Sequence, residues 1–133
     1  MTHSIADAAR RTGLSIDTLR YYERIGLLDP PARDSAGRRA YSDGDVHWLE
    51  FLTKLRTTGM PIRLMREYAQ LCREGVGTAA RRRQLLVEHR TAVRAHIGEL
   101  NGCLEALDWK IDNYAQVAAQ TPQTMTDNQE VPA

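Results

Sequence analysis

The chain has 133 residues, of which 42% are hydrophobic and 26% are charged. These values suit one compact domain, or a small domain with an extended helical appendage. The apolar runs are only a few residues long, which excludes a membrane span, and two cysteines are too few for a disulfide framework. We therefore expect a protein of the reducing cytoplasm that does not contact a membrane.

Charge is unevenly distributed along a chain whose net charge is +1. Residues 1–66 contain 11 Lys or Arg against 8 Asp or Glu, whereas residues 67–133 contain 7 against 9. Most of the basic residues are arginines, which can contact a carboxylate or a phosphate through two nitrogen atoms at once. The first half is therefore the part suited to an anionic partner, although a mild excess of arginine also fits an ordinary solvated surface.

Two short helices are predicted near the N-terminus. Ser4 can cap the first helix, and Gly13 ends it because glycine readily adopts the left-handed conformation. Ser15 caps the second helix, which is expected to stop at Gly26. With the small residue Ala9 at the crossing, this pair is typical of a helix-turn-helix, whose second helix lies in the DNA major groove. The alternative is an ordinary helical hairpin.

A basic β-hairpin is predicted next. Pro30 and Pro31 prevent helix formation, residues 34–37 favour a turn, and short strands fit on either side of that turn. The arginines of this hairpin are Arg33, Arg38 and Arg39. A helix-turn-helix followed directly by a basic hairpin predicts a winged helix, whose wing arginines reach backbone phosphates.

Helices follow the hairpin. One is predicted from Ser42 to Gly59, with aspartates in its first turn, and another from Pro61 to Gly75. A last helix is predicted from Thr78 to about Ala118.

Apolar residues recur with heptad spacing along this last helix, and only Arg90 interrupts them. The seam consists of Leu86, Val93, Ile97, Leu100, Leu104, Leu107, Ile111, Tyr114 and Ala118. An exposed seam of this size is not viable on a soluble monomer, so it predicts a partner helix, most simply the same helix of a second copy. Residues 119–133 have no such pattern and are predicted to be a disordered tail.

Three ordered motifs resemble the DNA-binding region of the mercury-resistance regulator (MerR) family. They are TLRYYERIGLL at 18–28, GRRAY at 37–41 and LRTTGMPI at 55–62, and the resemblance extends over about residues 4–118. It implies a mainly α fold, with a winged helix-turn-helix DNA-binding domain and its helical extension in residues 1–75. A dimerisation helix at 76–118 would then form an antiparallel coiled coil.

The resemblance also implies a function. A homodimer would bind a palindromic promoter operator in double-stranded DNA and distort it for RNA polymerase in response to an effector. The residues that it places at the DNA are Ser15, Ile16, Asp17, Thr18, Arg20, Tyr21, Tyr22, Arg38, Arg39 and Tyr41. Within this set Arg39 would contact a phosphate, Tyr41 would pack the wing, and at least one phenol of Tyr21 and Tyr22 would lie on a phosphate.

The signal is less well defined by the sequence. The sequence contains no Cys/His cluster, so no metal site is predicted, and no cofactor is expected. The short chain resembles the branch of the family that responds to aldehydes, thiol-reactive electrophiles or oxidative stress, but Lys54 stands where members of that branch often have a cysteine. The candidate effector residues are Cys72, Cys103 and Trp109. The alternatives are a buried core position for Cys72 and, for Trp109, packing against the partner's DNA-binding domain.

Other functional classes have less support. No Ser/His/Asp triad, carboxylate pair or phosphate loop is present, so an enzyme is not expected. The remaining alternative is a helical sensor or adaptor whose wing binds a protein instead of DNA. The arginines of the second helix and of the hairpin argue against it.

Overall fold

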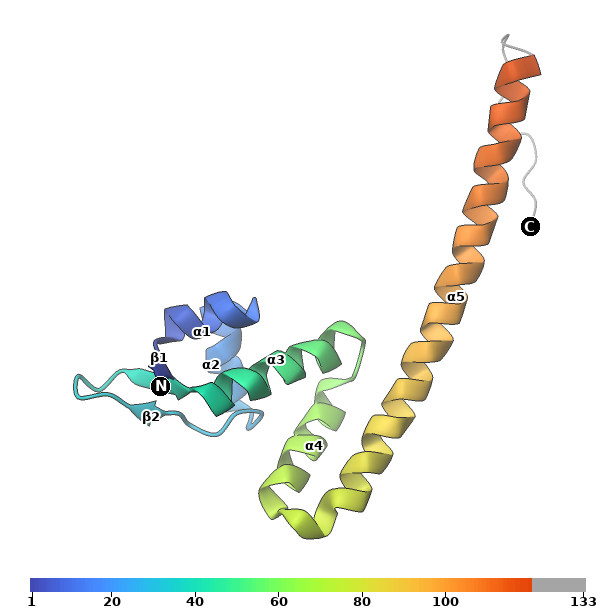
Figure 1. The fold of residues 1–133 in the computed structure, drawn as a ribbon. Coiled ribbons are helices and arrows are strands. Elements are labelled where there is room, and N and C mark those ends of the chain that lie inside the picture. Colours follow the sequence, from blue (N-terminus) through green and yellow to red (C-terminus); the bar gives the residue numbers. More distant parts are fainter. Residues whose placement is uncertain (121–133) are drawn as a thin grey trace. The chain divides into compact units, whose positions relative to one another are not determined.

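The computed structural model describes residues 1–120. Of the disordered tail predicted at 119–133, residues 119–120 instead end the last helix, and the remainder lies outside the described part of the chain. The elements are β1 (Thr2–His3), α1 (Ile5–Thr12), α2 (Ile16–Arg24), β2 (Ala32–Arg33), β3 (Arg39–Ser42), α3 (Asp43–Thr57), α4 (Ile62–Glu74), the short 3₁₀ helix η1 (Val76–Thr78) and α5 (Ala79–Gln120) (Figure 1). Residues 1–93 form one compact unit, and residues 94–120 belong to a second. This mainly helical architecture, with a helix-turn-helix, a wing and a long last helix, confirms the predicted fold class.

The helix-turn-helix forms where the capping residues predicted it. The Ser4 hydroxyl accepts a hydrogen bond from the Asp7 amide at 3.1 Å, and the Ser15 hydroxyl accepts one from the Thr18 amide at 3.0 Å. Gly13 has φ 77°, a left-handed conformation that a side chain would disfavour. The second helix ends at Arg24 and is therefore slightly shorter than predicted.

The wing belongs to a three-stranded antiparallel sheet in the order β1-β3-β2. Arg33 lies opposite Arg39 in the predicted hairpin. Strand β1, which the sequence did not predict, places His3 opposite Tyr41. A strand of two residues has no alternating pattern, so only its tertiary contacts define it.

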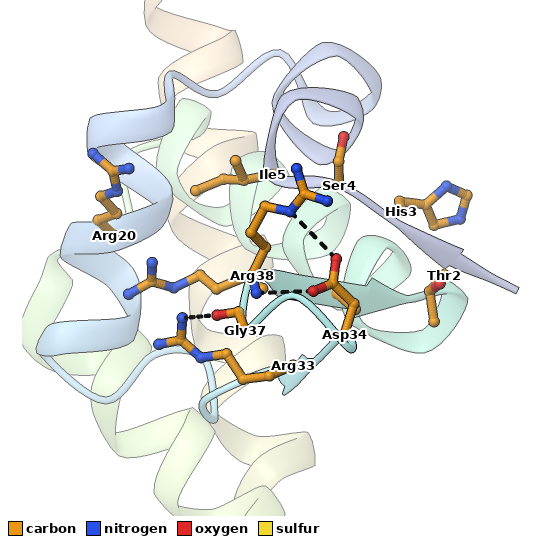
Figure 2. A pocket seen from close by; sticks show the side chains of 11 residues that line it. Thr2, His3, Ser4, Ile5, Arg20, Arg33, Asp34, Gly37 and Arg38 are labelled. Atoms are coloured by element: carbon orange, nitrogen blue, oxygen red, sulfur yellow. Dashed lines mark hydrogen bonds and ion pairs between the residues drawn. The ribbon is translucent and has the colours of Figure 1, made fainter.

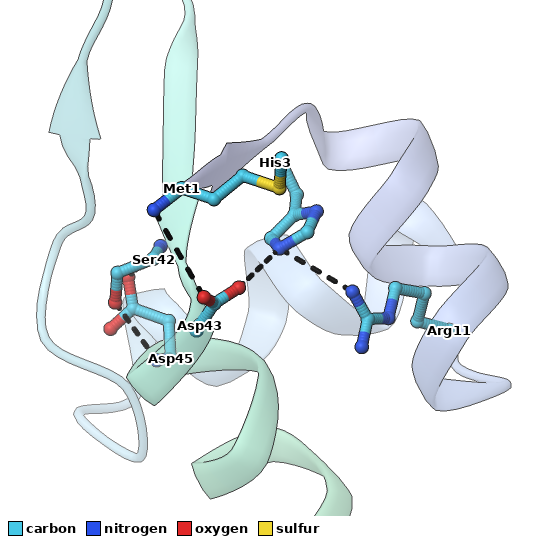
Figure 3. A network of polar contacts seen from close by, with 6 residues as sticks. All are labelled: Met1, His3, Arg11, Ser42, Asp43 and Asp45. Atoms are coloured by element: carbon cyan, nitrogen blue, oxygen red, sulfur yellow. Dashed lines mark hydrogen bonds and ion pairs between the residues drawn. The ribbon is translucent and has the colours of Figure 1, made fainter.

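Polar contacts hold β1 against the start of α3 (Figure 3). Nε2 of His3 lies 2.7 Å from Oδ1 of Asp43 and 3.5 Å from Nη1 of Arg11, and the N-terminal ammonium lies 4.0 Å from Asp43. The hydrogen bond to His3 is the main reason that the pKa of Asp43 is lowered. Beside this network, Ser42 and Asp45 form a capping box at the start of α3.

The core of the first unit joins α1 to α4 with the first turns of α5. Trp48 links these parts, since its Nε1 donates a hydrogen bond to the Leu27 carbonyl at 2.7 Å and its ring stacks on Tyr68 with centroids 5.9 Å apart. Leu85 is buried, and Leu86 packs against the same core. Leu86, which the heptad pattern placed in the seam, therefore belongs to the core of the first unit.

The second unit contains the remainder of α5, and its apolar side chains are exposed. Six seam residues between Ile97 and Tyr114 keep 43–62% of their surface exposed. Within the described residues no helix is long and apolar enough to cross a membrane.

Candidate nucleic-acid interface

Helix α2 presents one face to the core and the other to solvent. Leu19 is fully buried and Tyr22 is 4% exposed, and these two residues anchor the helix. The period of 3.6 residues then places Asp17, Arg20 and Tyr21 outward. At the N-terminus of the helix, Ser15 is the capping residue, and Asp17 and Thr18 belong to the first turn.

The structure distinguishes the two adjacent tyrosines, whose roles the sequence left open. Burial raises the pKa of Tyr22, and the nearby Arg56 partly opposes that rise. Tyr21 is 39% exposed, and the guanidinium of Arg24 lies 5.3 Å from its ring centroid. Tyr21 therefore presents the accessible phenol, whereas Tyr22 holds the helix in place.

The turn of the wing is stabilised by Asp34. Its Oδ1 accepts hydrogen bonds from the amides of Ala36 and Arg38, both at 2.9 Å. These bonds, led by that of Arg38, lower the pKa of Asp34 because they favour its charged form. Arg33 also donates to the Gly37 carbonyl at 2.9 Å, so the turn is ordered before any ligand binds.

An ion pair connects the wing to α2. Nε of Arg39 donates a hydrogen bond to Oε1 of Glu23 at 2.8 Å, and the two side chains are only 25% and 17% exposed. This bond is the main reason that the pKa of Arg39 is raised. Tyr41, on the same strand, is fully buried, which raises the pKa of its phenol and agrees with its predicted role of packing the wing.

Helix α2 and the wing enclose a groove of about 530 Å³ (Figure 2). Four arginines line it, together with Asp34 and the turn between β1 and α1. These arginines are Arg20, Arg33, Arg38 and Arg39. Since Asp34 is the one carboxylate among the lining residues, the groove has an excess of positive charge and of N–H donors, which suits phosphate groups.

The groove contains some of the predicted DNA-contacting residues and not others. It includes Arg20, Arg38 and Arg39. Tyr22 and Tyr41 were also predicted to contact DNA, but their burial leaves almost none of either side chain accessible. Ile16 is half-buried at the start of α2. Arg33 was missing from the predicted contacts, although its place on a basic hairpin was a usable signal.

The candidate effector residues lie in different surroundings. Cys72 is half-buried and lines a cavity of about 230 Å³ together with Trp48 and Arg73. Cys103 and Trp109 are both exposed on α5. Among residues 1–120, no group of three or more His, Cys, Asp or Glu is placed to hold a metal ion.

The fold and the groove define a winged helix-turn-helix regulator. Residues 3–72 match the model of the MerR HTH family regulatory proteins. The chain therefore belongs to the MerR family, and its relatives are transcriptional regulators that bind DNA.

Individual relatives agree with this assignment. An HTH-type transcriptional regulator of Haemophilus influenzae is 34% identical over 119 residues, which cover 90% of this chain and 88% of the relative. The regulator AdhR of Bacillus subtilis is 40% identical over 87 residues, covering 65% and 62% of the two chains. Among solved structures, HiNmlR, a MerR family regulator lacking the sensor domain and bound to promoter DNA, has a TM-score of 0.82 at 34% identity and covers 90% of this chain and 95% of its own.

Proposed function

We propose that this regulator binds a palindromic promoter operator as a homodimer, with residues 1–75 of each copy on the DNA and the helix at 76–118 joining the copies. The arginine-lined groove between α2 and the wing carries the proposal. In a winged helix-turn-helix, the recognition helix enters the major groove while neighbouring elements contact the backbone. The relative HiNmlR supports this arrangement, since its structure contains promoter DNA.

Roles follow from where each side chain lies. Ser15, Asp17, Thr18 and Arg20 on the outer face of α2 would meet bases and the adjoining phosphates. Arg33 and Arg38 at the wing would bind phosphates. Arg39 would turn part of its guanidinium to the DNA while its Nε stays on Glu23, because a guanidinium has five N–H donors.

The second copy is proposed from the exposed seam of α5. Arg90 interrupts the heptad pattern at a position that faces the partner helix. A parallel pair would bring the two Arg90 side chains together in the seam and also align Arg81, Arg82 and Arg83 with their counterparts. An antiparallel pair avoids both repulsions because it separates the arginine-rich ends of the two helices.

The regulator would respond to its effector by changing how the bound operator is twisted, which would alter the access of RNA polymerase to the promoter. We propose an electrophile, an aldehyde or an oxidant as the signal. The chain's two thiols, Cys72 and Cys103, support this class. Reporter assays with Cys72→Ser and Cys103→Ser under aldehyde stress test it, and full induction in both variants would exclude a thiol switch.

A footprint on the promoter region next to the gene of this protein tests the DNA-binding proposal. We expect a protected palindrome, with affinity well above that for random duplex of the same length. Binding to random duplex at low salt separates this function from that of a protein-binding adaptor, which would show almost none. Equal affinity for the promoter fragment and random DNA would exclude sequence-specific regulation.

A further inference from the structure

The chain segment that follows helix α2 is held from two sides. Helix α2 ends in a Schellman motif around Gly26, in which the Leu27 amide donates a hydrogen bond to the Tyr22 carbonyl at 2.9 Å. The Leu27 carbonyl accepts a hydrogen bond from the indole of Trp48 on α3 at 2.7 Å. The second contact comes from Arg73, in the last turn of α4. Two different helices therefore fix the point at which α2 ends.

Arg73 contacts this segment through two nitrogen atoms. Its Nε donates a hydrogen bond to Oδ1 of Asp29 at 2.7 Å, and its Nη2 donates one to the Gly26 carbonyl. Its Nη1 donates a third, at 3.3 Å, to Oε1 of Gln70 on α4. Arginine is the side chain with enough donors in one rigid plane to reach three such acceptors. The guanidinium also brings a positive charge to the carboxyl end of α2, where the helix dipole favours a cation.

We propose that Arg73 is a positioning residue for helix α2, and that it determines how well the protein distinguishes its operator from other DNA. The inference rests on the proposed operator binding and adds a residue that acts without contacting the DNA. Arg73 is not among the residues that line the groove between α2 and the wing, and it lines the small cavity beside Trp48 instead. It contacts the carboxyl end of α2, whereas base edges would be read from the N-terminal end.

The carboxyl end of α2 controls where the N-terminal end lies. Helix α2 has 9 residues, so its first and last residues are about 12 Å apart at ~1.5 Å per residue. A tilt of about 5° around the carboxyl end therefore moves the first turn by about 1 Å. Hydrogen bonds to base edges do not survive such a shift unchanged, because their N–H···O distances span only about 2.7–3.2 Å. Long arginine side chains on phosphates can follow it, so specific binding suffers more than general affinity.

The contact of Arg73 differs from an ordinary surface ion pair. The Arg73 side chain is only 33% exposed, although that of Asp29 is 72% exposed, and the Gly26 carbonyl is a backbone acceptor directly after α2. A matched pair lies nearby, since Arg81 of α5 contacts the Glu67 carboxylate of α4 at 2.9 Å. Neither residue of that pair belongs to the segment after α2. Arg81→Ala therefore removes an arginine and an ion pair from the same region without releasing α2.

Four full-length proteins test the inference: the wild type, R73A, R73K and the control R81A. Their affinities for the promoter fragment and for random duplex of the same length are measured at a temperature where each protein is folded. We expect R73A to lower the ratio of the two affinities about tenfold, while the affinity for random duplex and its salt dependence stay unchanged. R73K keeps the charge but reaches fewer acceptors, so its ratio should lie between those of R73A and the wild type. R81A should keep the wild-type ratio.

Amide NMR of the free proteins measures the position of α2 without DNA. The amide signals of Ile16, Asp17 and Thr18 should shift in R73A and R73K, although these residues lie at the opposite end of α2 from Arg73. The same signals should stay in place in R81A. Unshifted signals in both Arg73 variants would contradict the positioning role.

The binding data can overturn the inference in three further ways. A lower unfolding midpoint with an unchanged affinity ratio would leave Arg73 a purely structural role. Equal weakening on both duplexes, with a salt slope less steep by about one unit, would show that Arg73 contacts a phosphate directly. A ratio that falls as far in R81A as in R73A would mean that any broken ion pair on α4 has this effect. If R73A does not fold, R73K is judged by the same criteria.

Failure of the inference can be distinguished from failure of the proposed function. Equal binding of both duplexes by the wild type would overturn the proposed operator binding, and with it the role of Arg73 in specificity. A preference of the wild type for the promoter fragment that R73A and R73K fully retain would overturn the inference alone.

Discussion

Arg39 of the wing and Glu23 of α2 form a hydrogen-bonded ion pair, with 2.8 Å between Nε and Oε1. The pair joins two elements that are proposed to contact the same DNA molecule. Both side chains are mostly buried, so neither charge is well solvated if its partner is removed. The groove between α2 and the wing therefore has a fixed width before DNA arrives, which reduces the ordering that binding requires.

Arg39→Ala tests this connection. It leaves the Glu23 carboxylate without its partner, so we expect the free energy of unfolding to fall by about 1–3 kcal/mol. Binding of the promoter fragment should weaken, and the slope of log K against log salt should become less steep by about one unit if Arg39 also contacts a phosphate.

Glu23→Gln is the matched control for Arg39→Ala, because it keeps the shape of the side chain but removes its charge. It should lower the midpoint of thermal unfolding and preserve the salt dependence of DNA binding. An unchanged salt slope in Arg39→Ala would show that Arg39 serves only to position the wing.

Arg20→Ala should weaken binding of the operator roughly tenfold to a hundredfold, while thermal stability stays close to that of the wild type. Arg20 lies on the outer face of α2 and lines the groove, and its side chain has no role in the core. Arg66→Ala is a suitable control, since Arg66 is exposed on α4 and lies outside the groove. Fluorescence anisotropy with labelled duplex measures the affinity of both variants. Equal affinities of Arg20→Ala and Arg66→Ala would show that Arg20 does not contact the DNA.

Substitution of Tyr22 should mainly affect the stability of the protein, whereas substitution of Tyr21 should mainly affect its binding of DNA. Tyr22→Ala removes a buried ring and should destabilise the protein by about 3–5 kcal/mol. Tyr21→Phe should leave the unfolding midpoint unchanged and weaken DNA binding modestly, because it removes only an exposed hydroxyl. Loss of stability in Tyr21→Phe, with none in Tyr22→Ala, would reverse the assignment.

Local chemistry explains which parts of the fold could be predicted. Ser4, Gly13 and Ser15 act on residues a few positions away, and their effects were predicted from sequence order alone. The pairing of β1 with β3 joins Thr2 to Ser42, and no local pattern encodes it. A sequence likewise could not show which of two adjacent tyrosines is buried, because neighbouring helical residues differ by about 100° and the packing of the helix decides between them.

The arginines of the candidate site could be predicted from the sequence, but the groove that they line could not. Arg20, Arg38 and Arg39 follow from the motif order, and the groove that contains them depends on how the wing packs. Glu23 was missed because its partner is 16 positions away on another element. Leu86 was misassigned because heptad spacing continues across the point where α5 leaves the core of the first unit.

The wing should be sensitive to acid. The pKa of Asp34 is lowered from its ordinary value of 3.8 in the folded protein, so the unfolded chain takes up the proton first as the pH falls. The stabilisation from Asp34 is therefore complete above pH 4 and is lost as the pH drops below that value. NMR titration of the Asp34 carboxyl in the intact protein measures the shift directly. Asp34→Asn, which keeps an acceptor for the turn, should reduce the dependence of wing amide exchange on pH in this range, and an unchanged dependence would contradict this role.

Leu104→Glu should separate the two copies. Leu104 is 55% exposed on the single helix, so a charge there costs little in the monomer, but the same charge would be buried between paired helices. We expect the mass in solution to fall to that of one chain, measured by light scattering, while the midpoint of thermal unfolding of the first unit is retained. Operator affinity should fall strongly because the two recognition helices then bind independently. Ala106→Glu, on the outer face two residues away, is the control and should remain dimeric. If Leu104→Glu also remained dimeric with full operator affinity, the seam of α5 would not be the surface that joins the two copies.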